Sequence, residues 1–203
     1  MEDIKTIWAF VIALAAVVNG MGIVRLLGGL SEYLKNRNTL NIQHYRVYNV
    51  LFVFQVMAHL LLWWSILGLR EAGSINFLNY LYLIIGPTLL YLASSLMVPD
   101  AGDSNIDLRS EYFSFRESFY SLYIVFWLWA IFSWPVFGHG FSPTAPLLLV
   151  WLLFAVIMRL TEHPGIHAAL VTGNCVVYAV FIFLYAMQFG AVARSVVSPS
   201  APT

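Results

Sequence analysis

The sequence predicts an all-α fold, a polytopic membrane bundle of six transmembrane helices with both termini on the outside. The first observation is composition, because 61% of the residues are hydrophobic and only 10% are charged. A soluble domain carries about 25% charged residues. The second is that several apolar runs approach the roughly 20 residues that cross a bilayer, and in lipid such runs must form helices. The third is an uneven distribution of lysine and arginine between alternating loops.

The apolar runs divide residues 1–190 into six spans of one transmembrane domain. The chain begins MEDIKTIW, which is acidic and has no small-residue cleavage site, so the first run is predicted to be a retained helix. Pro87 lies at the centre of the third run and can kink that helix. The tail, 191–203, is low in apolar bulk and is expected to be disordered. The predicted spans are residues 7–27, 47–67, 77–98, 119–137, 146–161 and 166–189.

The longest polar connection, PDAGDSNIDLRSEYFSFRES, precedes the fourth span. Asp107 is predicted to cap a helix beginning LRSEYF, because aspartate accepts hydrogen bonds from the free N–H groups of a helix start. Arg109, Tyr112 and Arg116 follow at spacings of 3 and 4, which gives them one helix face. The sequence favours an amphipathic entry into the fourth span over a catalytic site.

The basic residues predict the orientation, because cytoplasmic loops carry the excess of lysine and arginine. Lys5, Arg70 and Arg194 lie on the side of the two termini. The opposite side is therefore predicted to be cytoplasmic. Its seven basic residues are Arg25, Lys35, Arg37, Arg46, Arg109, Arg116 and Arg159.

Small residues in the first span predict close helix packing. Lipid gives no hydrophobic reward for helix association, so close contact between small residues has to supply it. Two neighbouring faces carry such residues, and the second also carries Arg25 and Glu32. These two charges either pair with a partner helix or each other, or Arg25 extends to the lipid headgroups. The predicted packing residues are Ala9, Ala13, Ala16, Gly20, Gly22 and Gly29.

Polar residues recur near mid-depth on the first, second, third and sixth spans. Such groups usually face the bundle interior or a water-filled cavity. Gln55 and His59 are four apart and share a helix face, and His59 can change charge near neutral pH. The set either lines a hydrated path or ligand pocket, or supplies interhelical hydrogen bonds worth about 0.6 kcal/mol each. Its members are Asn19, Gln55, His59, Thr88, Tyr91, Asn174 and Tyr178.

A second polar cluster is predicted at the cytoplasmic ends, around RLTEHPGIH. Its two histidines, His163 and His167, do not share a regular helix turn because Pro164 and Gly165 intervene. Zinc usually needs three or four ligands, so no metal site is predicted. Haem ligation by His59 and His167 is disfavoured by a depth difference of about 12 Å, at 1.5 Å per residue. The cluster comprises Arg25, Glu32, Arg159, Glu162, His163 and His167.

Four motifs occur in a characteristic order: G-x-x-R-L-L-G-G-L, a tyrosine-led second span ending in Trp-Trp, L-x-x-x-L-M-V-P-D, and D-L-R-x-x-Y-F-x-x-R. In this order the chain resembles a group of small, uncharacterised bacterial integral membrane proteins, over roughly residues 15–125. The resemblance implies a bacterial inner (cytoplasmic) membrane. It carries over no activity and no functional residue.

The sequence contains no Ser-His-Asp arrangement, phosphate-binding glycine loop or H-E-x-x-H motif, which disfavours an enzyme without excluding one. Zero net charge argues against nucleic acid as a partner, and the single cysteine, Cys175, cannot form a disulfide within the chain. No cofactor is required by the sequence. The expected partners are the lipid bilayer and either further copies of the chain or another membrane subunit.

Three functions remain open. The leading hypothesis is a small channel or transporter that uses the midplane polar set. The second is an accessory or assembly subunit of a larger membrane complex, which docks through the small-residue face of the first span. The third is a quinone- or haem-linked redox subunit, suggested by abundant aromatic residues and five histidines.

Overall fold

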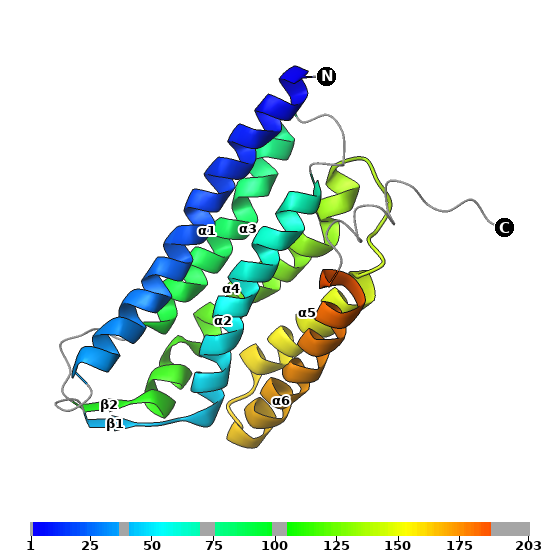
Figure 1. Ribbon diagram of the computed structural model, residues 1–203. Coiled ribbons are helices and arrows are strands. Elements are labelled where there is room, and N and C mark those ends of the chain that lie inside the picture. Colours follow the sequence, from blue (N-terminus) through cyan, green and yellow to red (C-terminus); the bar gives the residue numbers. More distant parts are fainter. Residues whose placement is uncertain (1, 37–40, 70–75, 99–104, 188–203) are drawn as a thin grey trace.

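The structure is a computed structural model that describes residues 2–36, 41–69, 76–98 and 105–187 (Figure 1). In these ranges the chain forms an all-α bundle. A short π-helical turn, η2 (Ile182–Ala186), continues the last helix. The helices are α1 (Glu2–Asn36), α2 (Arg46–Leu69), α3 (Phe77–Met97), α4 (Leu108–Val136), α5 (Ala145–Leu160) and α6 (Pro164–Phe181).

The helices alternate in direction, so that successive connections lie at opposite ends of the bundle (Figure 1). Helix α1 lies along α3 and also contacts α2, while α4 joins α3 to α5. Helix α6 packs against α5 and α2. The ends of α1 and α3, and the starts of α2 and α4, therefore meet at one end of the bundle, which we call the basic end because it also carries Arg46 and Arg109.

Two short strands join the connections at the basic end. Strand β1 (Asn41–Gln43) pairs in parallel with β2 (Asn105–Asp107), and Ile42 lies opposite Ile106. The sequence did not predict these strands, because three residues within a polar connection are too few to establish a hydrophobic period. The pairing fixes the segment after α1 beside the segment after α3.

The predicted all-α fold is confirmed. Five helices of the described chain are long and apolar enough to cross a bilayer: Ile7–Asn36, Arg46–Leu67, Phe77–Met97, Leu108–Val136 and Pro164–Ala186. The predicted fifth span, 146–161, is helix α5, which has only 16 residues. At 1.5 Å per residue it measures about 24 Å, short of the roughly 30 Å hydrocarbon core. The predicted disordered tail lies outside the described residues.

The fourth helix begins earlier than the predicted span, 119–137. Helix α4 starts at Leu108, and the predicted cap is confirmed, because the Asp107 carboxylate accepts a hydrogen bond of 2.9 Å from the Arg109 backbone N–H. Hydropathy predicts only the apolar part of this helix, because its first turns carry charged residues. Helix α3 continues through Pro87.

The face with which α1 packs differs in part from the predicted one. Gly22 and Gly29 do contact other helices, but Ala9 and Ala13 are exposed. Gly20 has open space beside it, and Ala16 is only half-buried. Specific contacts of another face accompany this rotation, because Asn19 bonds to His59 and Gly22 lies against the His59 ring. The buried face carries Trp8, Val11, Ala15, Asn19, Gly22 and Leu26.

The packing of α1 on α3 predicts opposite effects of alanine at two adjacent glycines. A Cβ atom at Gly29 would lie 2.7 Å from Val98 Cγ1, and valine has few rotamers with which to yield. We expect Gly29→Ala to reduce stability by about 1–3 kcal/mol, measured by thermal unfolding in mild detergent. Gly28 has nothing within 4 Å of such an atom. Gly28→Ala should be neutral or stabilising, and equal losses in both variants would contradict this contact.

Candidate functional site

Five buried polar side chains from four helices form one hydrogen-bonded cluster, which we call the central network. Helix α1 contributes Asn19, α2 contributes Gln55 and His59, α3 contributes Ser94, and α4 contributes Tyr123. Gln55, His59 and Ser94 are completely buried. The structure thus brings together three residues of the predicted midplane set and adds two that the sequence did not single out.

The distances in the central network are those of ordinary hydrogen bonds. His59 Nδ1 lies 2.7 Å from Asn19 Oδ1, and the Asn19 amide donates to the His59 carbonyl at 3.1 Å. On its other side, His59 Nε2 lies 2.8 Å from Ser94 Oγ. Gln55 Nε2 donates to the same oxygen at 2.9 Å, and the Tyr123 hydroxyl donates to Gln55 Oε1 at 2.5 Å. Every residue of the network is therefore bonded to another.

One set of proton positions satisfies the central network without any charge. The carbonyl of His59 only accepts, so it fixes the Asn19 amide with Oδ1 toward the ring and requires a proton on His59 Nδ1. In the neutral ring Nε2 then accepts from Ser94. A Ser94 hydroxyl turned to the Leu90 carbonyl, 2.9 Å away, would instead require a charged imidazole. No carboxylate of the described chain pairs with His59, so the neutral arrangement is favoured.

Gly22 makes room for the His59 ring. A Cβ atom at this position would lie 2.2 Å from His59 Cε1, closer than any real contact. The glycine therefore lets α1 approach the ring edge while Asn19, one turn earlier, bonds to its nitrogen. This explains one of the small residues that the sequence places in the first span.

The other predicted midplane residues lie outside the central network. The Thr88 hydroxyl donates to the Ile84 carbonyl of its own helix at 2.8 Å. Tyr178 is buried but packs between rings, stacked on Phe54 at a centroid distance of 4.8 Å. The buried Asn174 Oδ1 has no hydrogen-bond partner in the described part of the chain. Within the described ranges, no hydrogen bond links the Tyr91 side chain to the central network, so these ranges show no continuous polar path.

A second buried cluster joins α4 to the turn before α6. His167 Nδ1 lies 2.5 Å from the Tyr112 hydroxyl, which lies 2.9 Å from that of Tyr120. His167 Nε2 faces the Thr161 carbonyl at 2.9 Å and therefore carries a proton there. Tyr112 then donates to Nδ1 and accepts from Tyr120. Two aromatic hydroxyls and one imidazole thus complete a directed chain within the protein.

Arg116 is buried beside this cluster. Its Nη1 donates to the Thr161 carbonyl at 2.9 Å, and its Nη2 lies 3.3 Å from Glu162. The side chain is only 4% exposed, whereas the Glu162 carboxylate is 81% exposed. Arg116 therefore fixes the α5–α6 turn to α4 mainly through a backbone carbonyl, because an exposed ion pair contributes little.

The predicted cytoplasmic-end charge cluster is dispersed in the structure. Arg25 and Glu32 are exposed and do not form an ion pair with each other. Arg159 Nε donates to the Ser121 hydroxyl at 2.8 Å. The side chain of His163 is exposed, while its backbone N–H bonds to the Thr161 hydroxyl and its carbonyl accepts from the His167 N–H. Of the predicted cluster, Glu162, His163 and His167 therefore lie together around Thr161 and Arg116.

Close to these residues, Tyr45 precedes α2 at the basic end. Its ring lies 5.7 Å from that of Tyr112, centroid to centroid. The buried hydroxyl oxygen has no hydrogen-bond partner among the described residues. Burial raises the pKa of the Tyr45 phenol above its usual value, and the charge of Arg109 opposes the shift.

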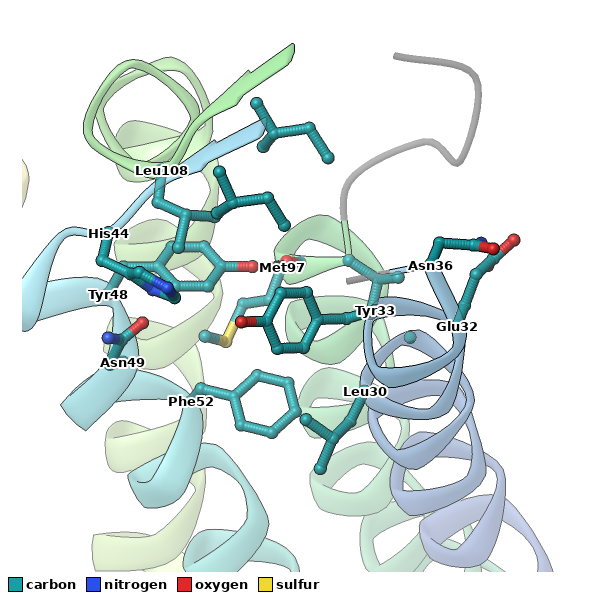
Figure 2. Close-up of a pocket in the computed structure, with 14 residues that line it drawn as sticks. Leu30, Glu32, Tyr33, Asn36, His44, Tyr48, Asn49, Phe52, Met97 and Leu108 are labelled. Carbon is teal, nitrogen blue, oxygen red and sulfur yellow. Dashed lines mark hydrogen bonds between the residues drawn. The ribbon is translucent and has the colours of Figure 1, made fainter. Parts of the chain in front are cut away.

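A cavity of about 330 Å³ opens at the basic end, where α1, α2, α3 and the strand pair meet (Figure 2). We call it the end pocket. Its volume falls within the range of about 300–1,000 Å³ that is typical of ligand sites. Its lining residues are Gly29, Leu30, Glu32, Tyr33, Asn36, Ile42, His44, Tyr48, Asn49, Phe52, Met97, Val98, Ile106 and Leu108.

The end pocket is apolar inside and polar at its rim. Figure 2 shows Tyr33 extending across it above Phe52, while His44 and Asn49 lie on the opposite side. The Tyr48 hydroxyl is already used, because it donates to the Met97 carbonyl. The pocket thus combines aromatic walls with a few polar groups, as small-molecule sites usually do.

The sequence did not predict Ser94 and Tyr123 of the central network or the residues of the end pocket, for two reasons. Ser94 and Tyr123 lie in apolar runs where a serine or tyrosine facing lipid would look the same. The end pocket depends on the strand pair and on the exact ends of α1 and α3, which carry no motif. One signal was present: Arg116, Tyr112 and Arg109 share a predicted face, and the structure buries Tyr112 and Arg116 on the bundle side.

The described residues hold no group of three or more His, Cys, Asp or Glu side chains placed to bind a metal ion. Comparison of the chain with protein-family models, curated proteins and solved structures finds no match. The candidate sites are therefore defined by their geometry alone.

The central network predicts unequal roles for two adjacent serines. Ser94→Ala would leave His59 Nε2 and one Gln55 N–H without a partner, and each such interhelical bond is worth about 0.6 kcal/mol on average. We expect a loss of roughly 1 kcal/mol in thermal unfolding in detergent. Ser95→Ala is the matched control, because the Ser95 hydroxyl bonds only to the Tyr91 carbonyl of its own helix. Equal stability of the two variants would contradict a network role for Ser94.

Proposed function

We propose that the protein is a multi-pass membrane protein that binds a small amphipathic molecule in the end pocket. One observation carries this proposal: a cavity of about 330 Å³ with an apolar interior opens where the helix ends meet the strand pair. The excess of basic residues in the connections at this end supports a cytoplasmic orientation of the pocket. The motif resemblance supports a bacterial inner membrane.

The hydrogen bonding of the polar side chains supports the end pocket, rather than the bundle interior, as the binding site. The side chains of the central network are bonded to one another, so a ligand there would have to break protein bonds before forming its own. At the pocket rim, by contrast, no hydrogen bond to another described residue engages the side chains of Tyr33, His44 or Asn49. A ligand can bond to these groups at the cost of displacing water alone.

This function predicts that filling the pocket prevents binding. Leu30 lines the cavity, and Leu30→Trp would occupy part of its volume. We expect at least a tenfold weaker Kd for Nile red, a neutral fluorophore that brightens in apolar sites, measured by titration in detergent against empty micelles. Leu27→Trp is the matched control, because Leu27 lies on the same helix, is 50% exposed and does not line the pocket. Equal affinities of both variants and the unchanged protein would overturn the proposal.

Transport of a small solute is the second candidate, and the central network is the observation that favours it. A polar cluster shared by α1, α2, α3 and α4 is the kind of element that a transporter rearranges between two states. Its fully bonded form would correspond to the closed state. The end pocket would then be the entrance on the basic side.

The transport candidate predicts solute flux that depends on His59. Proteoliposomes should be more permeable than protein-free liposomes to urea, glycerol or protons, as measured by light scattering and a pH-sensitive dye. His59→Leu, checked for folding by gel filtration, should lower the flux at least tenfold because it removes the centre of the network. Thr88→Val is the control, since the Thr88 hydroxyl bonds only to its own helix. Permeability no higher than that of empty liposomes would remove this candidate.

A further inference from the structure

We propose that the molecule bound in the end pocket carries an uncharged, flat ring with hydrogen-bonding oxygens and an apolar tail, which is the chemistry of a membrane quinone and its quinol. This inference rests on the proposed function and specifies its ligand. It concerns binding and assigns no redox step to the protein.

The charges around the cavity favour a neutral head. Among the described residues, neither lysine nor arginine lines the end pocket, so these residues offer no counter-charge to a phosphate or carboxylate head. Glu32 is the one carboxylate among the described lining residues, and Figure 2 shows its side chain at the outer edge, directed away from the cavity. A cationic head inside the pocket would therefore be as poorly compensated as an anionic one.

The polar groups at the rim suit a ligand that exists in two hydrogen-bonding forms. Tyr33, His44 and Asn49 each have both donor and acceptor capacity. A quinone offers only acceptors, whereas its quinol also donates, and hydroxyl, imidazole and amide groups can serve either form. No hydrogen bond to another described residue engages these three side chains, so their polar groups can bond to either form.

The aromatic walls favour a flat ring over a purely aliphatic molecule. The rings of Tyr33 and His44 meet edge to face, with centroids 6.3 Å apart. Phe52 lies below Tyr33, and Tyr48, whose hydroxyl is bonded to Met97, presents a ring rather than a polar group. Aromatic rings stack offset or edge to face on one another, with about 0.5–1.5 kcal/mol beyond the burial of their area. Leu30, which is partly exposed, offers an apolar exit for the tail.

The test compares two probes that share a tail but differ in the head. Purified protein in mild detergent is dialysed to equilibrium against decyl-benzoquinone or against decanol, with empty micelles as the blank. We expect decyl-benzoquinone to bind at least tenfold more tightly than decanol, and its quinol to bind within about threefold of the quinone. The double variant His44→Phe, Asn49→Leu should lose most of the preference for the ring while keeping decanol affinity. His163→Phe is the control, because His163 is exposed at the same end but does not line the pocket.

The outcomes distinguish a failure of the quinone assignment from a failure of the proposed function. Equal binding of decanol and decyl-benzoquinone, or an unchanged preference in the double variant, would overturn the quinone assignment and leave the amphipathic pocket standing. Binding of neither probe, together with no effect of Leu30→Trp on Nile red, would overturn both. Preference for the ring that disappears in the double variant but not in His163→Phe would support both.

Discussion

The hydrogen bonds of His59 are the interaction on which the arrangement of the first four helices depends. In a bilayer, apolar side chains gain nothing by leaving lipid for another helix, so a bundle needs specific contacts to fix its geometry. His59 bonds to α1 through Asn19 and to α3 through Ser94, while Gln55 on its own helix extends the contacts to Tyr123 of α4. Because each bond has a defined direction, the network fixes both the rotation and the height of these helices.

The end pocket follows from that arrangement. With α1 held against α2 at Asn19 and Gly22, the last turns of α1 continue alongside α3 until Gly29 meets Val98. Past that point the strand pair joins the two connections, and its facing residues Ile42 and Ile106 both line the cavity. The pocket is thus bounded by helix ends that cannot shift independently, which is what a preformed ligand site requires.

The sequence was sufficient for the helices and for the depth of the polar residues, but not for their partners. Apolar runs located every helix, and counting along them brought Asn19, Gln55 and His59 to one level. Which way a side chain faces depends on helix rotation, and here α1 packs with the face of Asn19 and Gly22 instead of the face that the spacing of Ala9 and Ala13 suggested. Ser94 could be identified as a hydrogen-bond partner of His59 only from the structure, which places α3 beside α2. The strand pair, too short to show any periodicity, required the fold itself.

The polar side chains of the central network and those at the rim of the end pocket differ in whether they are hydrogen-bonded to other residues. In the interior, a polar group without a partner is costly, so the residues retained there are those that bond to one another. At the basic end, Tyr33, His44 and Asn49 border an apolar cavity without side-chain hydrogen bonds to other described residues. Polar side chains that leave their bonding capacity open beside aromatic walls are suited to an external molecule. Under the proposed function, recognition would belong to the helix ends, and the buried network would supply the rigidity on which it depends.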